Sequence, residues 1–200
     1  MHVKGAFFVT QPAYRLMVAQ NYGRIVLVSS QSGMFGNPIR SNYGSAKTAM
    51  VGLMNVMAQE LPKGVAVNCL FPNAVGGRLG GAPGDIRPDA EFLAAAARRV
   101  PHYIDGMQPA FVAALVTYLS SEQCSTSQNM YSVLGGKYSR IFIGLTEGWY
   151  HGGKTGPTPE EILAHLPQID DRTHYALPLS GLDEMDTVLA LQAKLRNLDK

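Results

Sequence analysis

Residues 23–30 read GRIVLVSS, and residues 43–60 read YGSAKTAMVGLMNVMAQE after a turn-rich loop. The first segment is a short run of branched apolar side chains between a glycine and two serines, which is typical of a strand covered on both faces of a parallel sheet. The second segment has no proline, and its only charged residues are Lys47 and Glu60. Because its apolar side chains lie nearly all round, it is predicted to be a buried helix.

Lys47 is the most informative residue of the predicted helix, because a buried ammonium is costly unless it is paired or used. Tyr43 precedes it by four residues and so lies on the same helical face, one turn away. A phenol beside a fixed cation ionises more readily, which makes Tyr43 a candidate acid and base near neutral pH. Ser30 adds a hydroxyl at the carboxyl edge of the sheet, where ligands bind in open α/β folds. The structural alternatives are a capping role for Ser30 and a core role for Tyr43.

These residues resemble the short-chain dehydrogenase/reductase family. Tyr43 and Lys47 match its Tyr-x-x-x-Lys motif, and Ser30 stands thirteen residues before the tyrosine, as the family's serine does. An Asn-x-x-x-Pro match follows at Asn68 and Pro72. The resemblance implies that Tyr43 exchanges a proton with the substrate oxygen and that Ser30 holds this oxygen. It implies that Lys47 binds the nicotinamide ribose of NAD or NADP, whose own chemistry moves the hydride.

His2 is the fourth candidate catalytic residue. The family's helix before the serine strand normally begins Asn-x-x-Gly, and here Gly5 matches while His2 stands at the asparagine position. A similar histidine occurs in the (3R)-hydroxyacyl-CoA dehydrogenase branch represented by peroxisomal multifunctional enzyme type 2. The phrases Gly-Arg-Ile-Val and Phe-Pro-Asn-Ala resemble the same branch. The alternative is a solvated terminal histidine.

The cofactor-binding residues are implied by the same resemblance. In the family, Pro-Gly-x-x-x-Thr follows the second strand, but here Asn73 replaces the glycine and Gly77 the threonine. Only backbone contacts can then be expected after the proline. The implied set is Tyr43, Lys47, Pro72, Ala74 and Val75.

The family's Gly-rich turn, its residue that reads the adenine ribose and its Asn-Asn-Ala-Gly segment have no counterpart in these residues. The predicted fold class is therefore α/β, the carboxyl-terminal part of a Rossmann-like doubly wound parallel sheet whose first strands are missing. The 24–28 strand would then have an unpaired edge.

Besides the enzyme, two hypotheses about the function stay open. One is a non-catalytic remnant or oligomerisation module unable to bind a dinucleotide, and the other is a fragment completed by another chain or shortened by a wrong start site.

Periodicity and turn residues predict the other elements. These are a helix over 3–20 interrupted at Pro12, strands over 64–71 and 129–134, a loop over 74–88, and helices over 89–99 and 108–121. In the first helix, the side chains expected to point inward are those of Phe7, Phe8, Leu16 and Met17.

Residues 1–136 are predicted to form the partial dehydrogenase domain, and 137–200 an extension that packs on it. Within the extension we expect an edge strand over 140–145, a capping box at 158–161 and a final amphipathic helix.

Residues 148–155 match the spacing of a phosphate-binding loop, but such a loop needs a helix to begin at its lysine. Gly156 and two prolines argue against that helix.

Composition narrows the function classes. The 200 residues carry a formal net charge of +2 and no basic run, which argues against a nucleic-acid partner. No stretch is long and apolar enough to span a membrane, so a soluble chain without a signal peptide is expected. Two cysteines in unrelated settings suggest free thiols in a reducing compartment, hence a cytoplasmic location. No metal site is predicted, and the expected ligand is a small hydroxy or keto substrate.

The resemblance also implies a homo-oligomer. In the family, the Tyr43 helix and the helix that begins near Gln108 pair with their copies in another subunit. The expected contact surface on the Tyr43 helix consists of Met50, Leu53, Met54 and Met57.

Overall fold

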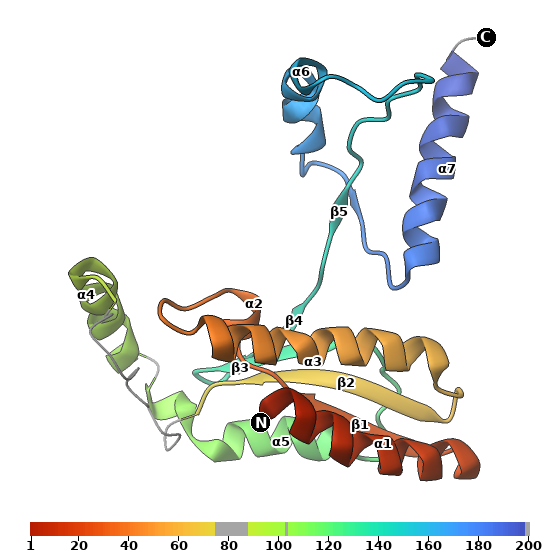
Figure 1. Ribbon diagram of the computed structural model, residues 1–200. Helices are drawn as coiled ribbons and strands as arrows, with labels where there is room; N and C mark the ends of the chain where they lie inside the picture. The colour runs from red at the N-terminus through yellow and green to blue at the C-terminus, as the bar shows by residue number, and fades with distance from the viewer. Residues whose placement is uncertain (75–87, 103, 199–200) are drawn as a thin grey trace. The chain divides into compact units, whose positions relative to one another are not determined.

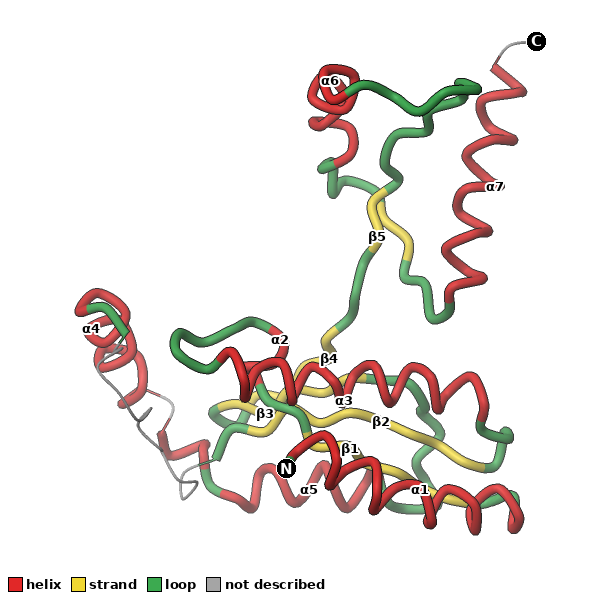
Figure 2. Tube along the Cα trace, in the orientation of Figure 1, coloured by secondary structure: helices red, strands yellow, loops and turns green. Residues whose placement is uncertain are grey.

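The computed structural model describes residues 1–74, 88–102 and 104–198 (Figures 1 and 2). The chain divides into two compact units, Met1–Ile141 and Phe142–Lys200, which are described separately. Val75 and most of the predicted 74–88 loop lie outside the described residues.

A four-stranded sheet organises the first unit. Its strands are β1 (Gly23–Val28), β2 (Val65–Pro72), β3 (Met130–Leu134) and β4 (Lys137–Ile141), in the order β1-β2-β3-β4. The first three are parallel, as the run of apolar segments predicted, whereas β4 is antiparallel to β3. The fold is thus the α/β class expected from the sequence.

The edge strand lies earlier in the chain than the predicted 140–145 segment. Gly135 and Gly136 have φ angles of 58° and 79°, and the flanking residues Leu134 and Lys137 are paired. Two glycines with positive φ allow a tight two-residue hairpin turn, so the chain reverses at once and β4 begins at Lys137. The first compact unit therefore ends at Ile141.

Five helices of the first unit have these bounds: α1 (His2–Gln20), α2 (Gln31–Met34), α3 (Ser41–Glu60), α4 (Ala90–Arg99) and α5 (Pro109–Leu119). Two short 3-10 turns cover Val100–His102 and Ile104–Met107. The expected start near residue 89 is confirmed, because the Asp89 carboxylate accepts the Phe92 amide at 2.7 Å and caps α4. Sequence patterns missed α2, which is only one turn long.

Helix α3 is buried on one face rather than all round. Its buried apolar side chains join alternate residues of β2 in a single core. They are Met50, Val51, Met54 and Met57. On the other side of the helix Val56 is 57% exposed. The methionine surface expected at an oligomer contact is therefore interior, because these side chains fill the space above the sheet.

Helix α1 differs from its prediction in two ways. It is continuous through Pro12 and has no fully buried residue. Met17 packs against the core as expected, but Phe7, Phe8 and Leu16 are 48%, 66% and 69% exposed. The reason is that α1 meets α3 and β1 along one stripe only, which also contains Ala6 and Tyr14.

The other face of the sheet carries α5, opposite α3 (Figure 1). Asn68, fully buried in β2, donates to the Thr126 carbonyl at 2.7 Å and accepts the Asn129 amide at 3.1 Å. Arg24 of β1 donates to the Ser121 carbonyl at 3.2 Å. These bonds satisfy polar groups in the 121–129 connection and hold it against the strands.

The second unit contains a two-stranded antiparallel sheet and two helices. The strands are β5 (Leu145–Thr146) and β6 (Tyr175–Ala176), and the helices are α6 (Pro159–Ile169) and α7 (Gly181–Leu198). The predicted capping box is present, because Thr158 and Glu161 bond each other's backbone amides. No described side chain of this unit is fully buried. On α7, the predicted amphipathic helix, the apolar side chains of Leu182 and Met185 are 71% and 63% exposed.

Candidate functional site at the end of β1

The end of β1 and the first turns of α3 are tied together at Lys47. The Ser29 hydroxyl donates to the Lys47 carbonyl at 2.8 Å, and the Lys47 ammonium donates to the Val28 carbonyl at 2.9 Å. Ser29 is buried, whereas Lys47 is half-buried. The expectation of an ammonium enclosed by hydrocarbon was wrong, because a backbone carbonyl and partial exposure supply its solvation. Among the described residues, two of the three ammonium hydrogens have no acceptor and could be donated to a ligand.

Tyr43 stands at the centre of the site. The Lys47 nitrogen lies 5.8 Å from the centroid of the Tyr43 ring, and the His2 ring meets the same ring edge-on with centroids 5.4 Å apart. Tyr43 and Lys47 thus share one face of α3, as their spacing predicted. His2 is exposed to solvent but reaches Tyr43 from the first residue of α1. The structure therefore brings three of the four predicted catalytic residues together.

Ser30 occupies the turn between β1 and α2. Its hydroxyl oxygen accepts the Ser32 amide at 3.2 Å, so the serine caps α2. Among the described residues this is the only hydrogen bond of the Ser30 side chain, and none joins it to Tyr43. The alternative considered from the sequence was a cap of the strand end, and the structure instead makes Ser30 the cap of a helix. Its hydroxyl hydrogen is still free to be donated to a ligand.

The predicted cofactor residues beyond Lys47 follow the end of β2. Pro72 and Ala74 are half-buried, and Val75 is outside the described residues. Between them the Asn73 side-chain amide donates to the Gln31 oxygen at 3.3 Å, which links the ends of β2 and β1. This edge of the sheet is where the parallel-strand pattern placed the site.

Cys69 of β2 lies beneath the site. Its thiol is fully buried next to Ser29, and this burial raises its pKa to about 12 from an ordinary 9.0. Cys69 and Cys124 are both free thiols, as predicted. A buried thiol that stays protonated makes folding sensitive to alkaline pH.

We expect this sensitivity to be measurable with Cys69→Ala. The unfolded thiol ionises above pH 9 while the folded one stays protonated up to about pH 12. The wild-type protein should therefore lose up to about 1.4 kcal/mol of unfolding free energy per pH unit through this residue within that window. Urea unfolding below pH 9 and between pH 9 and 12 checks the difference between the two proteins. A difference that is constant over both ranges would show that the thiol is not kept neutral by burial.

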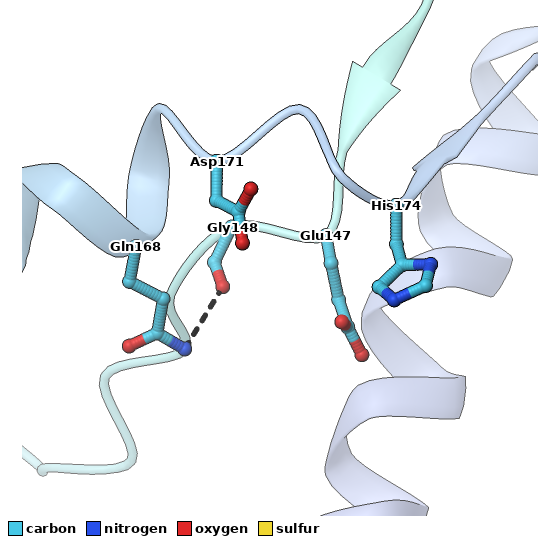
Figure 3. Close-up of a pocket in the computed structure, with 5 residues that line it drawn as sticks. All are labelled: Glu147, Gly148, Gln168, Asp171 and His174. Carbon is cyan, nitrogen blue, oxygen red and sulfur yellow. Dashed lines mark hydrogen bonds between the residues drawn. The ribbon is translucent and has the colours of Figure 1, made fainter.

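A polar hollow in the second unit contains none of the predicted residues (Figure 3). It is lined by Glu147, Gly148, Gln168, Asp171 and His174. Its carboxylates already have partners. Lys194 lowers the pKa of Glu147 through a 2.8 Å ion pair, and hydrogen bonds from Thr173 lower the pKa of Asp171. Within the described residues, no three His, Cys, Asp or Glu side chains are grouped so as to hold a metal ion.

The nearby 148–155 segment does not form a phosphate-binding loop. Helix α6 begins only at Pro159, four residues after Thr155, and Thr158 caps it. The His151 ring instead contacts the Thr155 carbonyl at 2.8 Å. No helix amino terminus therefore faces the segment's lysine, as the prolines had indicated.

One residue of the site was not identified from the sequence. The Arg40 guanidinium carbon lies 6.0 Å from the Tyr43 ring centroid, and Arg40 is half-buried. Arg40 stands three residues before the tyrosine and directly precedes α3, outside its helical turns. Ile39 just before it has a φ of 61°, which is unusual for a branched residue.

The fold and site together define a doubly wound α/β protein with a tyrosine–lysine pair at the carboxyl edge of its sheet. A family model described as short chain dehydrogenase matches residues 1–82. Over these residues the chain is similar to the short-chain dehydrogenase family, as the motifs of the Tyr43 helix predicted.

Known relatives agree with this assignment. Peroxisomal multifunctional enzyme A of Dictyostelium discoideum is 29% identical over 95% of this chain and 39% of its own length. A 3-oxoacyl-(acyl-carrier-protein) reductase of Synechocystis sp. is 37% identical over 38% of this chain and 31% of its own length. The solved full-length peroxisomal multifunctional enzyme type 2 from Drosophila melanogaster is 27% identical, with a TM-score of 0.75 over 97% of this chain and 33% of that one. The chain thus spans less than half the length of these relatives.

Proposed function

We propose that this protein is an NAD(P)-dependent oxidoreductase that interconverts a secondary alcohol and a ketone, with a 3-hydroxyacyl thioester as the first candidate substrate. The observation that carries the proposal is the contact of His2 and Lys47 with the Tyr43 ring. The relatives' names, which mention a peroxisomal multifunctional enzyme and a 3-oxoacyl reductase, support the substrate class. A steroid-like alcohol is the second candidate.

The residues suit an acid–base role on the substrate oxygen. The Tyr43 hydroxyl would take the proton of the alcohol, or return it to the ketone, while the Ser30 hydroxyl donates a hydrogen bond to the same oxygen. Lys47 would stabilise the ionised phenol by its charge. His2 would hold the Tyr43 ring in place through the edge-on contact.

The residues present fit the nicotinamide end of the cofactor. Lys47 spends one hydrogen on the Val28 carbonyl and retains two donors for ribose hydroxyls. Pro72 and Ala74, with the backbone that follows, would contact the nicotinamide ring. The cofactor, when bound, supplies the hydride acceptor or donor, and the protein supplies position and proton transfer.

The test is cofactor binding and turnover by the full chain. We expect the fluorescence of NADH or NADPH to rise on binding, and (3R)-3-hydroxybutyryl-CoA to be oxidised with release of reduced cofactor. If neither cofactor binds at millimolar concentration, the proposal is wrong. The non-catalytic remnant or oligomerisation module would then be favoured.

Location and assembly remain proposals. The cytoplasmic location is supported by the two free, buried thiols. Among the helices of the described residues, none is long and apolar enough to cross a bilayer.

A homo-oligomer would have to use other side chains than the interior methionines of α3. Phe8 and Leu16 of α1 and Phe111 of α5 are exposed apolar candidates.

A further inference from the structure

Among the described residues, the Arg40 side chain contacts the Tyr43 ring but has no hydrogen-bonding or charged partner. It is half-buried beside Tyr43, and among the described residues its side chain makes no hydrogen bond and no ion pair. A guanidinium has five N–H donors and a permanent charge, and such groups are normally paired when they lose part of their hydration. The stacking distance to Tyr43 satisfies none of these donors.

Residues 1–74, which include Arg40 and its helix, place no counter-charge near the guanidinium. Residues 1–74 contain six lysines and arginines but a single acidic residue, Glu60. Glu60 is the last residue of α3, whereas Arg40 is the residue just before the helix begins. At 1.5 Å per residue the two lie about 30 Å apart along the axis. The first turn of α3 has no acidic residue either.

The helix itself disfavours this arginine. The amino-terminal end of α3 carries a partial positive charge, so a cation at its capping position is destabilising unless something else uses it. Arg40 also makes no side-chain capping bond there. The residue therefore contributes nothing evident to the stability of the helix.

We propose that Arg40 binds a carboxylate of the substrate, so that the site accepts a free hydroxy or keto acid whose carboxylate is a few bonds from the reacting carbon. The inference rests on the proposed function, because it assumes that the reacting oxygen sits at Tyr43. A guanidinium pairs with a carboxylate through two parallel N–H···O bonds, which fixes the orientation of the acid. Thioester phosphates are many bonds from the reacting carbon and would not reach both Tyr43 and Arg40.

The alternative source of an anion is the cofactor pyrophosphate. In doubly wound folds this group rests on a helix amino terminus after a Gly-rich turn, not beside the acid–base residue. Arg40 directly precedes the helix of Tyr43 and lies beside the Tyr43 ring, so the substrate is the favoured source. A cofactor role would appear as weakened NADH binding in the Arg40 variants.

The test compares (R)-3-hydroxybutyrate with its neutral methyl ester on the full chain. Binding is followed by the NMR shift of the Tyr43 amide, which all the variants retain. We expect Arg40→Gln to weaken binding of the acid by about 10- to 100-fold and to leave the ester unchanged. Arg40→Lys should recover part of the loss. Arg15→Gln, which removes an equal charge from an exposed site on α1, should have no effect.

Three outcomes would overturn the inference. They are equal affinity of the wild type and Arg40→Gln for the acid, an equal loss for the ester, and no detectable binding of the acid to the wild type. Weakened NADH binding in Arg40→Gln with unchanged acid binding would assign the arginine to the cofactor instead. If (3R)-3-hydroxybutyryl-CoA is still oxidised, the proposed function stands while the carboxylate site fails. If neither cofactor binds, the proposed function itself fails.

Discussion

Tyr43→Phe should reduce alcohol oxidation by about 10²- to 10⁴-fold while leaving the fold intact. The variant retains the aromatic ring that contacts His2, Lys47 and Arg40, and it removes only the hydroxyl that would exchange the proton. The measurement is the steady-state rate of NAD(P)H formation at saturating substrate, together with thermal unfolding. The expected result is a lower turnover number at an unchanged melting temperature.

Tyr118→Phe is the matched control for this prediction. Tyr118 lies on α5, is 40% exposed and is not among the site residues. The Tyr118→Phe substitution also removes one phenolic hydroxyl group, and it should leave the turnover rate unchanged. Equal turnover by Tyr43→Phe and the wild type would show that the phenol is not the acid–base group. The site would then have to work through another donor.

Gly33→Ala should lower both stability and activity. A Cβ atom at this position would lie 2.8 Å from the Lys47 Cβ atom and 2.8 Å from the Thr48 backbone nitrogen. Contacts that short force α2 and α3 apart, and Thr48 also donates a hydrogen bond to the Gly33 carbonyl. We expect a loss of about 1 to 3 kcal/mol in unfolding free energy. Because Lys47 is displaced, the rate should fall by about 10- to 100-fold.

Gly52→Ala, on α3, gives the opposite expectation. Gly52 is exposed in the middle of α3, and nothing lies within 4 Å of an added Cβ atom. Alanine restricts the unfolded chain and favours helix, so this variant should gain up to about 1 kcal/mol and keep its rate. Urea unfolding of both variants separates the two effects. A Gly33→Ala protein as stable and active as Gly52→Ala would contradict the close approach of α2 to Lys47.

The local pattern predicted the catalytic helix well and its surroundings poorly. A spacing of four residues is sufficient to place Tyr43 and Lys47 on one face, because helix periodicity alone decides it. Hydrophobicity does not say which side of an apolar helix is covered. The sheet decided that Met50 is interior and that Val56 is exposed. The same limit explains why Phe8 was expected inside α1 and is exposed.

The assembled site shows a similar division. The sequence identified the serine, tyrosine and lysine by their spacing. The prediction of parallel strands also placed the ends of β1 and β2 at the same carboxyl edge of the sheet. It could not show that the Val28 carbonyl solvates the Lys47 ammonium, because that bond joins a strand to a helix nineteen residues later. Nor could it show that Ser30 caps a one-turn helix.

By itself, the sequence determined the class of the fold, the parallel order of its apolar strands and the placement of Tyr43 and Lys47 on one helical face. These follow from periodicity and spacing, which are properties of short segments. Only the tertiary structure decided which faces are buried, how thiol and ammonium are solvated, and that Arg40 lies beside the Tyr43 ring. Burial and charge pairing depend on segments that are distant in the chain, and no local pattern records which of them meet.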